Sequence, residues 1–336
     1  MNKNRTTIKD VARLAGVSTT TVSRALNGNF TMMTAATRER VEEAIRQLRF
    51  VPNAMARGLH QRLTQTVGLL IQDITNPYYP LIVQGVENAA RRSGYSLLFA
   101  NVQRSQQRRR HYLEVMKEKR VDGLIIIGGG IVRDADEEMT VLADVPVVVV
   151  GNSDDGFASV QIDNQAAARM AVEHLITNGH KNIALLTGTK NSMTSWQREL
   201  GYEEAMLAAG LKAPKKWRLS GGFTYEGAQP AMGRLLKAAP EITAVFALND
   251  LMAIGALNAL RKSGRRVPED ISVLGFDDIP AAEYVTPSLT TVSIPFRPMG
   301  CQAMDMLTEL ITGQNKKKIK VFPVELSSRN SVILRR

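Results

Sequence analysis

The spacing of apolar residues divides the chain into two parts. Up to about residue 60, apolar residues recur every three or four positions, which is the period of amphipathic helices. From Thr66 onward, short continuous apolar runs such as residues 67–71 alternate with helical segments. Such runs are typical of strands that are buried on both faces of a sheet. The pattern predicts a small all-helical segment followed by a larger α/β body.

The first segment begins with two short helices joined by a tight turn. Thr7 is placed to cap the first helix, and Asp10, three residues on, can bond back to it as in a capping box. Gly16 ends this helix, because a left-handed residue after a helix costs glycine least. Ser18 then caps the second helix. That helix buries one apolar stripe and turns short polar and basic side chains outward: Thr19, Thr20, Ser23 and Arg24.

The outer face of the second helix suits the major groove of DNA. Short hydroxyl side chains and one arginine can reach base edges there. The alternative is an ordinary helical hairpin packed on a core. A third helix over residues 35–48, capped by Thr34, completes a three-helix domain that we place at residues 1–50.

Positive charge is concentrated in the same segment. The chain carries a net charge of +11, and residues 1–62 supply +7 of it, with 11 Lys and Arg against 4 Asp and Glu. A charge gathered in a short segment is the electrostatic footprint of a nucleic-acid-binding module. A solvated basic face is the alternative.

Residues 8–27 match the pattern hxDVAxxAGVSxxTVSRxLN, where h is apolar. They resemble the helix-turn-helix of the lactose-repressor (LacI) family of bacterial transcription regulators, and the resemblance continues over nearly the whole chain. It implies DNA contacts from this segment and from the one that follows: Thr7, Ser18, Thr19, Thr20, Thr21, Ser23, Arg24, Asn27, Asn53, Ala56 and Leu59. Within this set, Thr19, Thr20 and Arg24 match positions that contact bases in the family.

Residues 51–63 are predicted to form a hinge helix and a linker. Asn53 is a good cap for a short helix that ends near His60. The stretch VPNAMARGL resembles the family's hinge helix, two of which enter the minor groove side by side in a dimer. The resemblance implies that Leu59 wedges into the central base step and kinks the duplex. The alternative is a plain linker.

The rest of the chain alternates strands and helices, which predicts parallel, doubly wound sheets. The last strand is predicted over residues 321–326. The resemblance implies two lobes with the periplasmic-binding-protein-like fold, between which the chain crosses near residues 163, 293 and 326. We therefore expect an N-terminal lobe of residues 64–163 plus 294–325 and a C-terminal lobe of residues 164–293 plus 326–336.

Ligands of open α/β sheets bind beyond the carboxyl ends of the strands. Aromatic rings, Arg, Asn and Asp gather at the predicted ends: Asp73, Tyr78, Tyr79, Trp196, Arg198, Phe223, Asn249 and Asp277. Aromatic faces stack on the C–H faces of sugars or on flat rings, and charged groups hydrogen-bond hydroxyls. These side chains form our candidate effector site.

The resemblance sharpens this candidate site. Arg198 in the motif RxxGY, Asn249, and Asp277 in the motif GFDD match positions that bind the polar groups of effectors, and Tyr78, Tyr79 and Phe223 match aromatic positions that line the pocket. For Asp277 the alternatives are a helix cap or an interlobe salt bridge. For each tyrosine the alternative is core packing.

The sequence carries no catalytic, cofactor or metal motif that would favour an enzyme. Residues 73–77 stand where a dehydrogenase would need G-x-G-x-x-G, and no P-loop, H-E-x-x-H or G-x-S-x-G occurs. Cys301 is the only cysteine, and the four histidines lack metal-ligand spacing. No apolar run is long enough to span a bilayer, and no apolar signal region is present, so we expect a cytoplasmic protein.

We therefore expect a homodimeric transcriptional repressor that needs no cofactor. It binds a pseudo-palindromic duplex operator, and a small molecule, a sugar or sugar derivative, controls it from between the lobes. The alternative is a cytoplasmic carbohydrate-binding or sugar-converting enzyme with an incidental basic N-terminus.

Overall fold

The structure is a computed structural model that describes residues 6–26, 29–30, 33–50, 63–103, 105–128, 145–152, 156–314 and 318–335. It divides into two compact units, Met1–Thr64 and Gln65–Arg336, and each is described by itself. The predicted hinge helix and the short helix expected near residues 136–142 lie outside the described residues. Within the described part, no helix is long and apolar enough to cross a membrane.

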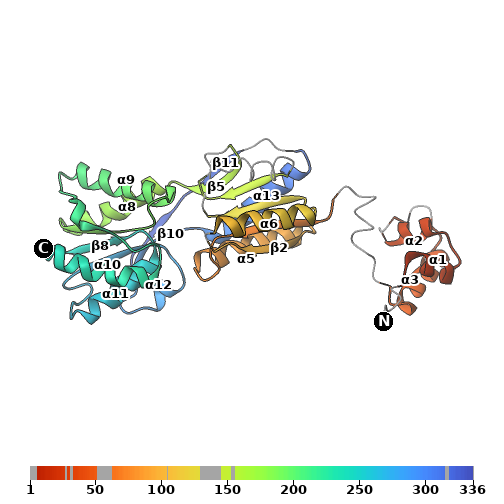
Figure 1. The fold of residues 1–336 in the computed structure, drawn as a ribbon, viewed down its shortest axis with the longest axis horizontal. Helices are drawn as coiled ribbons and strands as arrows, with labels where there is room; N and C mark the ends of the chain where they lie inside the picture. The colour runs from red at the N-terminus through yellow and green to blue at the C-terminus, as the bar shows by residue number, and fades with distance from the viewer. Residues whose placement is uncertain are drawn as a thin grey trace. The chain divides into compact units, whose positions relative to one another are not determined.

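The small unit is the predicted three-helix domain, with helices α1 (Ile8–Ala15), α2 (Thr19–Leu26) and α3 (Ala35–Gln47) (Figure 1). One apolar cluster holds them together: Val11, Ala12, Ala15, Val22, Val41 and Ala44. The predicted caps are confirmed. The Asp10 carboxylate accepts from the backbone N–H of Thr7 at 2.9 Å, and Gly16 adopts φ 63° after α1. Thr34 accepts from the backbone N–H of Thr37 at 3.2 Å at the start of α3.

The first sheet of the large unit has six strands in the order β11-β5-β4-β3-β1-β2, and all of its pairs are parallel. Its strands are β1 (Thr66–Ile71), β2 (Ser96–Asn101), β3 (Gly123–Ile127), β4 (Val147–Val150), β5 (Ala158–Ile162) and β11 (Ile319–Phe322). Its helices are α5 (Tyr78–Arg92), α6 (Gln106–Glu118) and α13 (Phe296–Ile311).

Alternate residues of these strands face different helices, as the two-residue period of a strand requires. In β1, Leu69 and Ile71 pack with α5 and α13, whereas Leu70 packs with Leu113 and Met116 of α6. The apolar run of β1 is therefore buried on both faces, as its sequence predicts.

The second sheet has the order β12-β10-β9-β8-β6-β7. Its strands are β6 (Ile183–Thr187), β7 (Arg218–Ser220), β8 (Ala244–Ala247), β9 (Ser272–Asp277), β10 (Thr290–Ser293) and β12 (Glu325–Ser327). Its helices are α8 (Asn164–Thr177), α9 (Met193–Ala208), α10 (Tyr225–Ala238), α11 (Asp250–Lys262) and the short α12 (Ala281–Tyr284), with the 3-10 turn η1 (Lys215–Trp217) before β7. Figure 1 shows α8 and α9 on one face of this sheet and α10 and α11 on the other.

The single strand predicted over residues 321–326 is wrong. The chain forms β11 and β12 instead, and these strands belong to different sheets. Pro323 lies between them, and proline lacks the N–H that a continuous ladder would need. β12 also runs antiparallel to β10, so the second sheet departs from the predicted parallel arrangement at its edge. The apolar residues around Pro323 resemble a single strand in the sequence, but the chain passes there from one sheet to the other.

Close packing between α8 and α9 sets the position of the candidate site. An added Cβ at Gly201 of α9 would lie 2.2 Å from the Gln165 carbonyl oxygen of α8, so the backbones approach where a side chain would not fit. Arg198 lies one turn before Gly201 on α9, and Asn164 begins α8. The two helices therefore hold these two side chains near one another.

Candidate functional site

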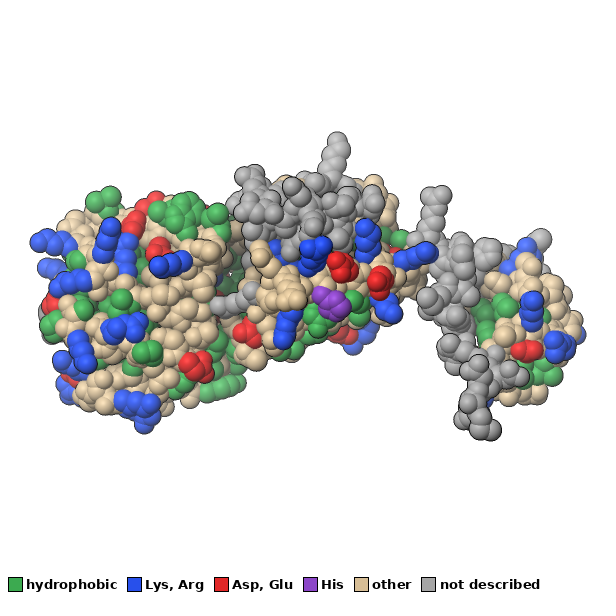
Figure 2. All heavy atoms as spheres, viewed as in Figure 1, with side chains coloured by type: hydrophobic (Ala, Val, Ile, Leu, Met, Phe, Trp, Pro, Cys, Tyr) green, Lys and Arg blue, Asp and Glu red, His purple; other side chains and the backbone are tan. Residues whose placement is uncertain are grey.

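The outer face of α2 presents the predicted base-contacting side chains. Thr19, Thr20 and Arg24 are exposed, whereas Val22 of the same helix is fully buried. Among the described residues, Arg24 has no recorded ion-pair partner, while Arg46 on α3 pairs with Glu43 at 2.5 Å. Basic side chains predominate over acidic ones on the face of this unit that Figure 2 shows, whereas both signs are interspersed on the large unit.

Other predicted DNA-contacting residues of α1 and α2 have partners within their own turn. The Thr7 hydroxyl donates to Asp10 at 2.7 Å, and hydrogen bonding from Thr7 lowers the pKa of that carboxyl. The Ser18 hydroxyl oxygen accepts from the backbone N–H of Thr21 at 3.1 Å and lies 2.9 Å from the Thr21 hydroxyl oxygen. Ser23 is partly buried. The remaining predicted contacts lie outside the described residues: Asn27, Asn53, Ala56 and Leu59.

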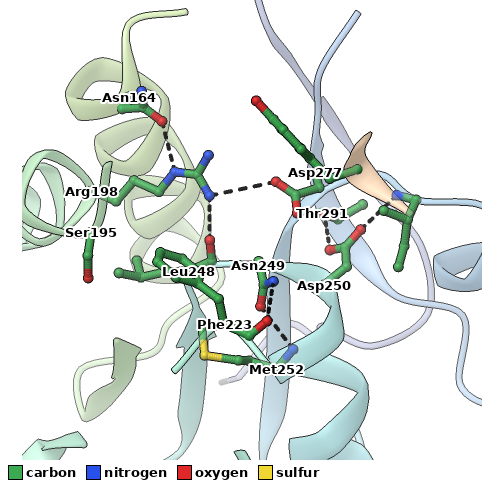
Figure 3. Close-up of polar contacts among 12 residues, drawn as sticks. Asn164, Ser195, Arg198, Phe223, Leu248, Asn249, Asp250, Met252, Asp277 and Thr291 are labelled. Carbon is green, nitrogen blue, oxygen red and sulfur yellow. Dashed lines mark hydrogen bonds and ion pairs between the residues drawn. The ribbon is translucent and has the colours of Figure 1, made fainter. Parts of the chain in front are cut away.

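Arg198 is the central cation of the second candidate site (Figure 3). Its side chain is almost fully buried, and its Nε donates to Asn164 Oδ1 at 2.8 Å. One terminal nitrogen, Nη1, donates to the carbonyl oxygen of Leu248 and lies 3.6 Å from Asp277 Oδ1. The guanidinium also stacks on Phe276, with Cζ 3.6 Å from the ring centroid. Three parts of the C-terminal lobe therefore fix this arginine: α8, the residue after β8, and β9.

Asp277 ends β9 in an unusual backbone conformation. Its φ is 126° and that of Asp278 is 61°, a region that favours glycine. Strained backbone of this kind costs about 1–3 kcal/mol and persists where surrounding contacts impose it, often at ligand sites. Asp277 is buried, and burial raises its pKa, Arg198 opposes that rise, and the carboxylate of Asp250 adds to it.

Asp250 is a second buried carboxylate, which stands at a predicted strand end but which we did not count among the effector contacts. As the first residue of α11 it accepts from the Thr291 hydroxyl at 2.6 Å and from the backbone N–H of Ile279 at 2.9 Å. Burial raises its pKa to about 6. An added Cβ at Gly275 would lie 2.2 Å from Asp250 Oδ1, so glycine leaves room for the carboxylate. The sequence signal was an acidic residue directly after Asn249, at the end of a buried strand.

Asn249 serves first as the N-cap of α11. Its Oδ1 accepts from the backbone N–H of Met252 at 3.0 Å, and its Nδ2 donates to the carbonyl oxygen of Phe223 at 3.2 Å. Phe223 has φ 62°, and its ring covers Gly188, where an added Cβ would lie 2.0 Å from Cε2. Asn249 therefore ties the Phe223 loop to α11, and its contact with an effector stays a prediction.

The N-terminal lobe contributes Tyr78, the first residue of α5. Its ring packs edge-to-face on Phe296, with centroids 5.1 Å apart, and on Tyr79 at 5.0 Å. Burial and the charge of Asp277 raise the pKa of Tyr78 to about 12, and Arg198 opposes this rise. Tyr78 is therefore the predicted aromatic residue on which the charges of Arg198 and Asp277 act.

Three other predicted effector contacts have different surroundings. Tyr79 is 6 % exposed and packs into the core of the N-terminal lobe beneath Gly128. Asp73 Oδ1 accepts from the backbone N–H and hydroxyl of Thr75, at 3.0 and 2.7 Å. Trp196 is 55 % exposed on α9. Neither Asp73 nor Trp196 has a hydrogen bond or ion pair with Arg198 or Asp277 among the described residues.

An amide pair that we did not predict links the two lobes. Asn152 follows β4 of the first sheet, and its Nδ2 donates to Gln197 Oε1 on α9. Asn164, which holds Arg198, was also missed. No signal in the sequence indicated either contact, because the partners are separated by 45 and 34 positions. In the described part of the chain, no group of His, Cys, Asp or Glu could hold a metal ion.

Comparison with known proteins identifies the family of both parts of the chain. Residues 7–53 match the family model described as bacterial regulatory proteins, lacI family, and residues 64–327 match that of periplasmic binding proteins and the sugar binding domain of the LacI family. The chain belongs to the LacI family of bacterial regulatory proteins. The predicted family and fold class are confirmed.

Relatives of known name match nearly the whole chain. The HTH-type transcriptional repressor PurR of Aliivibrio fischeri (strain MJ11) is 37 % identical over 98 % of this chain and 99 % of its own. A structure of the transcriptional regulator CelR with cellobiose is 36 % identical, with TM-score 0.74 over 97 % of this chain and 100 % of that one. The Lac repressor dimer bound to operator and the anti-inducer ONPF is 30 % identical, with TM-score 0.89 over 98 % and 100 %.

As a LacI-family member, the chain is a DNA-binding transcriptional repressor with a small-molecule effector, and not an enzyme. The alternative of a sugar-converting enzyme with an incidental basic N-terminus is therefore wrong. The exposed face of α2 and the buried cluster around Arg198 are the sites of this chain that suit DNA and an effector.

Proposed function

We propose that this repressor is a homodimer that binds a pseudo-palindromic operator, and that a sugar or sugar derivative controls it from the cleft between the lobes. The observation that carries the proposal is the buried Arg198–Asp277 pair of the C-terminal lobe, next to the Asn152–Gln197 hydrogen bond that joins the two lobes, with Tyr78 of the N-terminal lobe as the third proposed contact. A ligand that contacts all three residues bridges the lobes. The relatives support the effector class, because one is a complex with cellobiose.

In this proposal, α2 reads the major groove through Thr19, Thr20 and Arg24. Neighbouring hydroxyl groups contact the same half-site, and the hinge reads the operator centre with Leu59 as its wedge. Residues 1–50 bind DNA, residues 51–63 form the hinge, and the two predicted lobes form the effector body. Because the repressor binds chromosomal DNA, it acts in the cytoplasm.

Closing the cleft around an effector moves the lobes relative to each other. The segment that joins the DNA-binding domain enters the N-terminal lobe at β1, so the spacing of the two hinges in a dimer changes with closure. Effector and operator then bias the same equilibrium, and each must change the affinity of the other by the same factor.

The experiment has two stages. An operator is selected from a random duplex library with the purified full chain, and effectors are found by thermal shift against neutral sugars, including cellobiose and ribose, and against nucleosides. A ligand at 100 times its Kd stabilises the native state by about 2.7 kcal/mol. Operator titrations follow, with and without each ligand that stabilises the protein. A ligand that binds the cleft and leaves operator affinity unchanged contradicts the proposal.

A further inference from the structure

The buried guanidinium of the candidate effector site already has its charge matched by this chain. Arg198 Nη1 lies 3.6 Å from Asp277 and also donates to the carbonyl oxygen of Leu248, while Nε donates to Asn164. The ring of Phe276 covers one face of the guanidinium. Among the residues drawn in Figure 3, no hydrogen bond or ion pair is marked at the second terminal nitrogen of Arg198. Hydrogen-bonding capacity is left at that nitrogen, although the positive charge is paired.

Asp250 adds a second negative group to the same cluster. It lies fully buried, and its charge acts on both Arg198 and Asp277. Above about pH 6 the Asp250 carboxylate is mostly ionised, since its pKa is raised only to about 6. With the Asp277 carboxylate paired to Arg198, the three groups together carry a net negative charge, and removing that carboxylate makes the cluster more positive by one charge. The cluster offers no positive surplus to an anion.

Helix N-termini often bind phosphate, but four of those near this cluster are already capped. Four helices that follow strands begin with a side-chain oxygen that accepts a backbone N–H of the first turn: Asn76 for α5, Ser192 for α9, Thr224 for α10 and Asn249 for α11. The short α12 and α13 begin after Pro280 and Pro295 and have no side-chain cap. In α11 the carboxylate of Asp250 also lies in the first turn, where the helix dipole favours negative charge.

We propose that the effector of this repressor is an uncharged molecule, and that Asp277 excludes phosphorylated and carboxylated relatives of it by keeping Arg198 paired. Hydroxyl or carbonyl groups of the effector bind the remaining donors of Arg198 and the Asp277 carboxylate, while Tyr78 packs on its apolar face. An incoming phosphate would have to displace Asp277 and leave that carboxylate buried without its partner. The proposal rests on the proposed function only in placing the effector at this cluster.

Inorganic phosphate is the probe, because it needs no knowledge of the effector. Thermal unfolding of the full chain is measured at about pH 7.5 with increasing phosphate, against chloride at equal ionic strength. The wild type should show no saturable shift. Asp277→Asn and Asp277→Gly should bind phosphate about tenfold more tightly or better. The glycine variant suits the φ of 126°, so it removes the carboxylate and relieves the backbone strain.

Two controls locate the effect. Arg198→Gln combined with Asp277→Asn should lose the gained phosphate binding, because the guanidinium is gone. Glu325→Gln makes the same change in charge at an exposed position of β12 and should bind no phosphate. A saturable phosphate shift of the wild type that Arg198→Gln abolishes overturns the proposal, and so does failure of both Asp277 variants to gain one.

A paired measurement on the wild type gives an independent result. Ribose 5-phosphate should stabilise the protein no more than ribose does. Tighter binding of the phosphate ester through Arg198 would make the effector class anionic. Operator binding is measured separately, so an anionic effector would overturn this inference without touching the function of the chain as an effector-controlled repressor.

Discussion

The two ligand-facing regions of this repressor present their polar groups in opposite ways. On α2, Thr19, Thr20 and Arg24 are exposed, and Arg24 has no recorded ion-pair partner among the described residues. In the candidate effector site, Arg198 and Asp277 are 4 % and 3 % exposed and are held by neighbours from several elements. A hydrated surface recognises DNA by many separate contacts, whereas a buried, pre-organised cluster recognises a small molecule as one unit. Changes in the two regions should therefore have different kinds of consequence.

The largest expected effect concerns salt and the exposed region. Residues 1–62 carry a net charge of +7, which a dimer doubles. If six to ten phosphates are contacted, operator affinity should fall by roughly 10³–10⁵-fold between about 50 and 200 mM salt. Fluorescence anisotropy of a labelled operator measures the slope. Sugar binding in the cleft should change little over the same range, because buried pairs are poorly screened. If operator affinity did not change with salt concentration, the expected difference between the exposed region and the buried region would be contradicted.

Arg198→Met tests whether the cleft behaves as one buried unit. It leaves Asp277 buried without a partner, so the free energy of unfolding should fall by about 3–5 kcal/mol. Both tryptophans, Trp196 and Trp217, lie in the large unit, so tryptophan fluorescence in urea follows that unit. Arg169→Met is the matched control, since Arg169 pairs with Glu173 at 3.1 Å on an exposed helix face. It should cost at most about 1 kcal/mol.

The pair should also behave non-additively. Arg198→Met combined with Asp277→Asn removes both charges and should recover a large part of the lost stability. Equal losses from Arg198→Met and Arg169→Met would show that burial does not set the two regions apart.

Asp250 makes the stability of the cleft depend on pH. Its pKa rises from 3.8 to about 6 on folding, so the native state binds the proton more tightly than the unfolded state. Stability from this group is present below about pH 4 and is lost as the pH rises to about 6. Relative to Asp250→Asn, the wild type should therefore lose about 3 kcal/mol between about pH 4 and 7. Urea unfolding at several pH values measures this difference, and parallel pH profiles of the two proteins would contradict it.

The difference between an exposed helix face and a buried cluster also explains which features the sequence could predict. The start of α1, the turn at Gly16 and the start of α2 depend on residues at most four positions apart, so their caps and outer face follow from local pattern. Tyr78 and Tyr79 are neighbours on α5 and equal in sequence terms. Only the packed fold directs Tyr79 into the lobe core and Tyr78 toward the Arg198–Asp277 pair.

Longer-range features escaped prediction for the same reason. The strands before and after Pro323 belong to different sheets. This follows from the order of strands in the two sheets, which no local sequence pattern indicates. In the sequence, Asp250 and Asn249 stand side by side at the end of the same strand, and nothing distinguishes their roles. Only the fold brings Gly275, Ile279 and Thr291 around the Asp250 carboxylate. Buried clusters assembled from distant segments therefore need the fold, whereas an exposed helix face does not.

The smallest expected effect concerns Arg24 on the exposed face of α2. Arg24→Ala should cost about 1–3 kcal/mol of operator affinity if the guanidinium makes a bidentate base contact, and it should relax preference at one base pair in each half-site. Arg46→Ala removes the same charge from α3, where Arg46 is exposed but paired with Glu43, and it should weaken all duplexes slightly and equally. Competition between the selected operator and single-substitution duplexes separates these outcomes. Because Arg24 is exposed, stability should stay unchanged, unlike in Arg198→Met. Uniform weakening by Arg24→Ala across all sequences would instead make Arg24 a phosphate contact.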